Sequence, residues 1–118
     1  MREVKSFERV YLYRGIVDFR KWAAGLAQVV EHELSEVLVD ANRIFVFVSR
    51  DRRSVKCLYW NKTGLAVWTT KLEAETFKMD RKREGGVWIS PHQLEWILAG
   101  LDYTKLKPHK EVTVKKIS

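Results

Sequence analysis

The chain has 118 residues and a net charge of +7, with 22 Lys and Arg against 15 Asp and Glu. This length suits one domain with a substantial core and excludes two ordinary domains. A hydrophobic share of 46%, including five Trp, excludes an intrinsically disordered chain. The excess of positive charge favours an acidic partner, with nucleic acid as the first choice ahead of an acidic protein surface or anionic lipid.

The first third of the chain predicts a strand and then a helix. Residues 10–13 form a short apolar run that Arg14 and Gly15 end, which is typical of a strand. Asp18 is placed to cap a helix that runs to about residue 35. Arg20 and Lys21 would lie in its first turn, where the helix dipole disfavours cations, so they indicate an anion or an acidic partner. The apolar face of this helix comprises Phe19, Trp22, Ala23, Leu26, Val29, Val30 and Leu34.

The centre of the chain predicts three antiparallel strands at residues 44–48, 55–60 and 65–72. Residues 61–64 form a turn between the second and third strands. Residues 50–53, three Arg and one Asp, form the tip between the first two. Residues 37–42 either continue the preceding helix or form a short strand, and the sequence leaves both open. Neighbouring residues of a strand face opposite ways, so Tyr59 and Trp60 cannot both point into one core.

The last third predicts a charged loop, a strand, a helix and a tail. Residues 78–84 are charge-dense and predict an exposed, mobile loop; residues 87–89 predict a short strand. Ser90 and Gln93 form a capping box around Pro91, and Gly100 ends the helix that follows. Residues 105–118 predict a flexible basic tail, in which residues 112–114 could form an edge strand. The chain is therefore expected to be a single α+β domain over residues 1–104. Its antiparallel sheet is built around a three-strand meander with two flanking helices.

The expected cellular location follows from the lack of a membrane-spanning segment and of a signal peptide in the sequence. No apolar stretch approaches the roughly 20 residues that span a bilayer. The first five residues lack the apolar core of a signal peptide. The single cysteine, Cys57, excludes an internal disulfide, and its place in a strand predicts a buried thiol. We therefore expect a cytoplasmic location and no membrane partner.

The arginine-rich tip is the strongest candidate for a binding site. Arginine presents a planar fork of donors that suits phosphate or guanine. Contact with DNA, contact with a protein and simple solvation of a hairpin tip remain alternatives. Aromatic residues in the neighbouring strands, Tyr59, Trp60 and Trp68, either stack bases or fill a core. The proposed DNA contacts are Arg20, Lys21, Arg50, Arg52, Arg53, Lys56 and Lys71.

Catalytic chemistry finds no support in the sequence. The three histidines, His32, His92 and His109, are scattered, without the spacing of a metal-binding helix. No pair of carboxylates is placed for a two-metal nuclease, and no phosphate-binding glycine loop is present. We expect no catalytic residue, no metal and no cofactor, and hence no enzyme.

Several short motifs carry a resemblance through their order, and those from Phe45 to Glu73 have no insertion between them. They are Asp18-Phe19-Arg20-Lys21, Phe45-Val46-Phe47, Arg50, Val55-Lys56, Leu58-Tyr59-Trp60, Gly64, Trp68, Leu72-Glu73, Ser90-Pro91-His92-Gln93-Leu94 and Gly100-Leu101-Asp102. Together they resemble the second-open-reading-frame proteins (TnpB-type) of the bacterial insertion-sequence-sixty-six family, which are distinct from the RNA-guided nucleases of the same name. The chain departs from the family pattern at Trp22, Ala24, residues 37–42, Asp51 and Arg53.

The resemblance implies a role beside a transposase and not a particular chemistry. The leading hypothesis is a non-catalytic accessory protein of transposition that binds DNA with little sequence preference. The alternative is an interaction module that docks onto the transposase without touching DNA. Exposed aromatic surface, such as Trp88 or Trp96, would carry that docking.

Overall fold

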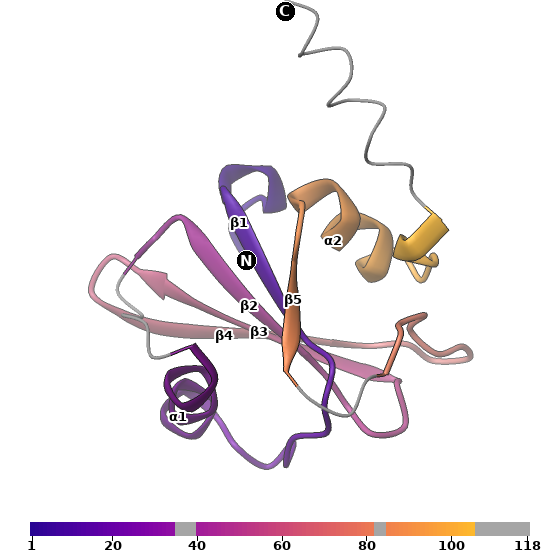
Figure 1. Ribbon diagram of the computed structural model, residues 1–118, viewed down its shortest axis with the longest axis horizontal. Coiled ribbons are helices and arrows are strands. Elements are labelled where there is room, and N and C mark those ends of the chain that lie inside the picture. The colour runs from indigo at the N-terminus through magenta and orange to yellow at the C-terminus, as the bar shows by residue number, and fades with distance from the viewer. Residues whose placement is uncertain (35–39, 82–84, 106–118) are drawn as a thin grey trace, which may run out of the picture.

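A computed structural model of the chain describes residues 1–34, 40–81 and 85–105. It contains one five-stranded sheet with the strand order β4-β3-β2-β1-β5 (Figure 1). The strands are β1 (Arg9–Tyr13), β2 (Arg43–Val48), β3 (Ser54–Asn61), β4 (Gly64–Lys71) and β5 (Gly86–Ile89). The α-helices are α1 (Ala23–Leu34) and α2 (Pro91–Leu98), and the short 3₁₀ helices are η1 (Val4–Ser6) and η2 (Tyr103–Lys105).

The sheet is mixed, so the expectation of an antiparallel sheet is wrong at one strand pair. β1 pairs with β2 in parallel, in the register Val10 to Ile44 and Tyr13 to Phe47. The β2–β3, β3–β4 and β1–β5 pairs are antiparallel. Parallel neighbours need a long crossover connection, and α1 lies in the one between β1 and β2. Local strand patterns do not reveal which strands pair, so the sequence could not show this.

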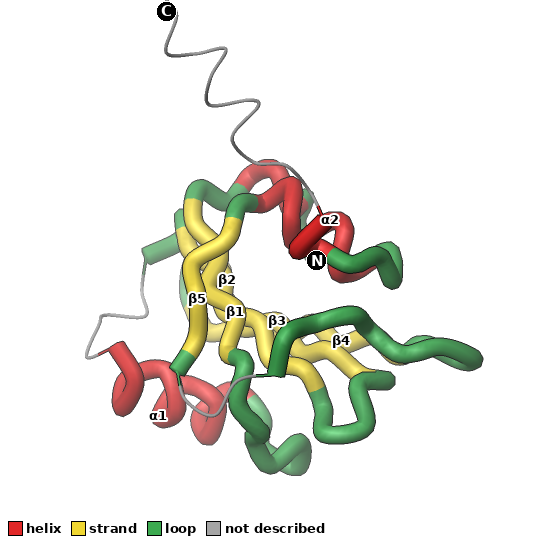
Figure 2. The backbone as a smooth tube through the Cα atoms, turned by 45° about the vertical axis from the view of Figure 1, so that its right-hand side comes forward, coloured by secondary structure: helices red, strands yellow, loops and turns green. Residues whose placement is uncertain are grey.

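The two helices lie on opposite faces of the sheet (Figure 2). Because side chains alternate along each strand, each face has its own apolar core. The core beneath α2 includes Leu12, Val46 and Cys57 with Leu94 and Ile97 of the helix. The core beneath α1 is built by Tyr11, Phe45, Phe47, Leu58, Leu26 and Val30, among others. β2 is buried on both faces, which explains its uninterrupted apolar sequence.

The helix α1 begins later than the sequence predicts. It starts at Ala23, so Asp18 is not its N-cap. The Asp18 carboxylate instead accepts a hydrogen bond from the Arg20 backbone N–H at 2.9 Å and forms a local turn. Trp22 lies before the helix and is 53% exposed, so its assignment to the buried helical face is also wrong. An apolar residue at helical spacing need not face the core when the helix starts beyond it.

The C-terminal helix has the predicted start. The Gln93 N–H donates to Ser90 Oγ at 3.1 Å and the Ser90 N–H donates to Gln93 Oε1 at 2.9 Å, which confirms the capping box. Gly100, with φ +82°, follows the end of α2 as expected. Across the described ranges, no helix has the length and apolar character needed to cross a membrane.

The charged segment after β4 is less exposed than its composition predicts. Phe77 and Met79 are buried beneath the sheet, and Arg81 is half-buried. Lys78 and Asp80 are exposed and lie in a loop, as predicted, whereas the expectation of exposure is wrong at Met79 and only partly met at Arg81. Residues 82–84 lie outside the described ranges. Whether residues 37–42 continue the helix or form a short strand concerns mostly residues outside the described ranges. The predicted tail beyond residue 105 also lies outside them.

Candidate nucleic-acid interface

One end of the sheet collects the basic residues of several segments. β1, β2 and β4 finish there, and β3 and β5 begin there, as the strand pairings require (Figure 1). We call this surface the basic end and define it by Arg50, Arg52, Arg53, Lys71 and Arg81. The sequence predicts four of these five residues as DNA contacts, and the structure brings those four to the same end.

The tip between β2 and β3 is held by hydrogen bonds to an acid, Asp51, and two of its three arginine side chains are exposed. Asp51 Oδ1 accepts hydrogen bonds from Ser49 Oγ at 2.7 Å and from the Arg53 N–H at 3.0 Å. These bonds, with that from Ser49 the larger cause, hold the pKa of the Asp51 carboxyl below its usual value. Asp51 is thus a turn-forming residue. Arg50 and Arg52 beside it are exposed.

Arg81 is a member of the basic end that sequence reasoning missed. Its Nη1 donates to the Gly15 carbonyl oxygen and its Nη2 to the Ser49 carbonyl oxygen, both at 2.7 Å. Burial lowers the pKa of this guanidinium, and the like charges of Arg52 and Arg50 lower it further. Its hydrogen bonds go to backbone carbonyls, so they satisfy its donors without cancelling its charge. The charge-dense run at residues 78–84 was the only sequence signal for it.

The remaining two members are placed differently. Arg53 Nη1 donates to the Glu73 carbonyl oxygen at 3.1 Å, so part of its fork is already used. Lys71 is exposed and pairs with Ser54 across the β3–β4 ladder, directly beside the tip. Arg50, Arg52 and Lys71 therefore offer the most accessible positive charge of the basic end.

Lys56 is not available at the surface. It is only 7% exposed, and its Nζ donates to the carbonyl oxygens of Phe19 at 2.5 Å and Lys21 at 2.8 Å. Burial lowers the pKa of this ammonium, an effect that Asp18 partly opposes. The accessible set of cations is thus smaller than the predicted one. A lysine within a strand looks the same in sequence whether its face is open or covered, and the segment before α1 covers this one.

Arg20 and Lys21 lie apart from the tip, on the segment that leads into α1. The Arg20 guanidinium contacts the Asp18 carboxylate at 2.8 Å, yet 91% of its side chain is exposed. That pairing holds the pKa of Asp18 well below its usual range. Lys21 lines a shallow cavity of about 310 Å³ against α1, together with Tyr13, His32 and Glu33.

Most of the aromatic side chains considered as base-stacking or docking residues pack against one of the two cores. Tyr59 packs edge-on against Phe7 at 5.4 Å, and Trp60 is half-buried on the opposite face, as strand alternation predicts. Trp96 and Trp88 are half-buried against the two cores, and the Arg9 guanidinium lies 3.9 Å from the Trp88 ring centroid. Among the described residues, the most exposed aromatic side chain is Trp22.

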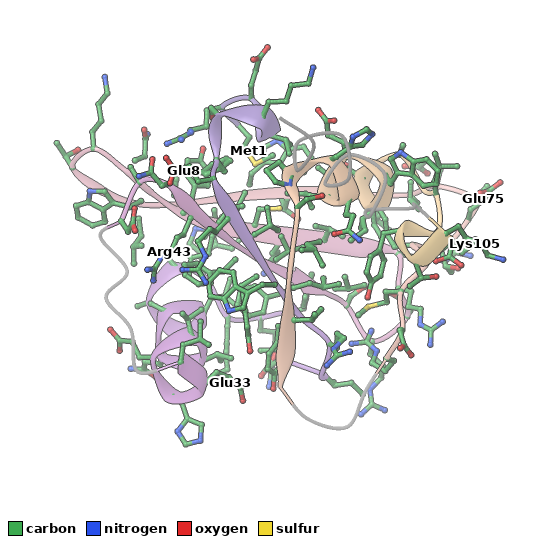
Figure 3. The ribbon with its side chains drawn as sticks, turned by 45° about the horizontal axis from the view of Figure 1, so that its top comes forward. Met1, Glu8, Glu33, Arg43, Glu75 and Lys105 are labelled. Atoms are coloured by element: carbon green, nitrogen blue, oxygen red, sulfur yellow. The ribbon has the colours of Figure 1, made fainter. Side chains whose placement is uncertain are left out.

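A second cavity, of about 440 Å³, opens beside the basic end. It is lined by Arg52, Lys78, Met79, Asp80, Asp102 and Thr104, a mixture of both charges. Thr104 of this lining precedes Lys105, which Figure 3 shows on the same side of the molecule as Glu75. Within the residues placed by the structure, no group of three His, Cys, Asp or Glu side chains could hold a metal ion.

The fold and its basic end define a small α+β domain that displays positive charge at one end of a mixed sheet. The chain belongs to the family described as IS66 Orf2 like protein, whose profile matches residues 8–108. This membership indicates a role accessory to the transposition of an insertion sequence.

Two proteins of Sinorhizobium fredii (strain NBRC 101917 / NGR234) are similar to the chain. The uncharacterized protein y4jC is 33% identical over 93 residues, which are 77% of each chain. The uncharacterized protein y4hO is 30% identical over 95 residues, which are 80% of this chain and 82% of that protein. No solved structure matches the chain.

Proposed function

We propose that this protein is a non-catalytic accessory factor of insertion-sequence transposition that binds DNA phosphates at its basic end and acts with the transposase of the element. The observation that carries the proposal is the convergence of Arg50 and Arg52 on Arg81. Within the described residues, the Arg81 guanidinium donates its hydrogen bonds to carbonyl oxygens, and its pKa is lowered first by burial and then by the like charges of Arg52 and Arg50. A bound phosphate would offset this concentration of like charge, and arginine forks match phosphate geometry.

Phosphate binding of this kind has a measurable signature. Each neutralised phosphate of duplex DNA releases counterions, so the logarithm of the binding constant falls with the logarithm of salt concentration by about 0.9 per contact. The test is fluorescence anisotropy of labelled duplex DNA across a salt series, with the terminal repeats of the element and a scrambled duplex. Replacing Arg50→Gln and Arg52→Gln together should flatten the slope by roughly 1 to 2.

A charge-matched control is available at the opposite end of the sheet. Lys5 in η1 and Lys62 in the β3–β4 turn are exposed and lie away from the basic end. Their double change, Lys5→Gln with Lys62→Gln, removes the same charge and should leave the slope nearly unchanged. Equal slopes for both double variants would refute a localised interface.

Docking onto the transposase without DNA contact is the alternative function. Half burial of Trp88 and Trp96 leaves little of the aromatic surface on which that alternative relied. The same titration separates the two functions. A protein that binds neither duplex at low salt would have to act through the transposase alone.

A further inference from the structure

A buried lysine whose ammonium is bonded to carbonyl oxygens and not to a carboxylate is costly, and Lys56 is such a lysine within the described part of the chain. Its ammonium lies under the segment that leads into α1 and donates to the carbonyl oxygens of Phe19 and Lys21. Asp18 partly opposes the effect of burial on the pKa of Lys56, but its carboxylate is already bound to Arg20. An apolar side chain would fill the core beneath α1 without this penalty. The role of the Lys56 ammonium must therefore lie in the groups that it holds in place.

What Lys56 holds in place is an exposed indole. The Lys56 Nζ lies 4.8 Å from the Trp22 ring centroid and 4.9 Å from that of Phe19. The Trp22 carbonyl oxygen also accepts the Leu26 N–H at 2.8 Å, which fixes its backbone to the first turn of α1. Trp22 is nevertheless 53% exposed. A ring that is held on one side by an ammonium and is open to solvent on another has less conformational entropy to lose when a ligand binds.

The surroundings of this ring are cationic. Arg20, which is paired with Asp18 but keeps 91% of its side chain exposed, and Lys21 precede Trp22 in the sequence. Lys56 pairs with Thr69 across the β3–β4 ladder, and Lys71 lies two residues further along β4 on the same face, about 7 Å away along the strand. An exposed aromatic between cations is the arrangement by which proteins bind single-stranded DNA, with the ring stacking a base and the cations contacting phosphates.

We propose that Trp22 is a stacking platform for an unpaired base, and that the protein binds single-stranded as well as duplex DNA. Arg20, Lys21 and Lys71 contact the flanking phosphates, and Lys56 is the positioning residue that fixes the platform. This inference rests on the proposed DNA-binding function and adds the class of DNA that the site accepts. This surface would engage an unpaired strand next to the duplex held at the basic end.

The test compares labelled oligo(dT) with a duplex of equal length in anisotropy titrations at one salt concentration. Trp22→Ala should weaken binding of oligo(dT) by at least about fivefold, the loss expected for one stacked base. The duplex affinity should change by less than about twofold, because a paired base offers no face to the ring. Trp22→Phe should retain most of the oligo(dT) affinity. Ile16→Ala, which changes another exposed apolar residue of the same segment, should alter neither.

The outcomes separate this inference from the function on which it rests. If the protein binds duplex through the basic end but Trp22→Ala leaves oligo(dT) binding unchanged, the stacking platform is refuted and a protein contact for Trp22 is favoured. Equal loss on both DNAs would also refute it, because stacking acts only on unpaired bases. If the wild-type protein binds neither DNA, the proposed function fails as well.

Discussion

Two residues in left-handed backbone conformation give a matched test of the basic end. Arg52 has φ 62° and Lys62 has φ 59°, and they are the non-glycine residues with positive φ in the described ranges. Arg52 lies in the tip between β2 and β3, and Lys62 in the turn between β3 and β4. Strand β3 separates them by eight residues, or roughly 26 Å. That separation exceeds the Debye length of about 8 Å at physiological salt.

Changing each residue to Asn removes one positive charge and installs a side chain better suited to positive φ. Because an ordinary residue in this conformation carries strain of about 1 kcal/mol, both Arg52→Asn and Lys62→Asn should raise the free energy of unfolding by up to about 1 kcal/mol. The side chain of Arg52 is exposed at the rim of the cavity beside the basic end, so its loss should remove little packing. A function in DNA binding would explain why a strained arginine stands at this tip.

The two variants should differ in DNA binding alone. Arg52→Asn should flatten the salt dependence of duplex binding by about 1 in slope, the loss of one phosphate contact, and Lys62→Asn should not change it. Urea unfolding followed by tryptophan fluorescence gives the stability, and anisotropy across a salt series gives the slope. An equal loss of affinity in both variants would mean that net charge, and not the basic end, governs binding. A destabilised Arg52→Asn variant would show that its side chain supports the fold.

Three further predictions concern the tip, the core and one strand contact. Asp51→Asn keeps the oxygen that forms the turn but removes the acid beside the arginines, so duplex affinity should rise by roughly threefold, and a fall would place Asp51 in a different role. Burial raises the pKa of the Cys57 thiol from 9.0 to about 12, so the unfolded chain loses this proton before the folded chain does. Stability should therefore fall as pH rises from about 9 towards 12, less so in Cys57→Ala, and a thiol reagent should label the wild type only on unfolding. A Cβ on Gly86 would meet the Leu12 carbonyl oxygen at 2.4 Å, whereas one on Gly64 would meet nothing within 4 Å. Gly86→Ala should thus lower the free energy of unfolding by about 1–3 kcal/mol in urea unfolding, and a Gly64→Ala variant that loses as much would refute the steric explanation.

Features that depend on neighbours in sequence were predictable. The start of α2 follows from Ser90, Pro91 and Gln93, because a capping box is made within one turn of helix. The turn before β4 and the apolar runs of β2 and β3 are equally local. The arginine tip could be located for the same reason, since two adjacent strands fix the residues between them.

Features that depend on distant parts of the chain were not predictable. The parallel pairing of β1 with β2 joins segments separated by α1, and no local pattern encodes it. Lys56 is buried because residues 19–21 happen to cross its face of the sheet, and Trp22 is exposed because α1 begins one residue later. Arg81 joins the basic end through carbonyl oxygens at the end of β2 and in the residues just after β1 and β2.

The sequence by itself determined the class of fold, the positions of most strands, the capped helix and the family, because periodicity, turn chemistry and motif order are written along the chain. The tertiary structure alone decided which cations meet at one end of the sheet, which lysine is withdrawn from solvent and which tryptophan is displayed. The physical reason is that charge and aromatic surface act through space: their value depends on burial and on neighbours, and the packing of the folded chain sets both.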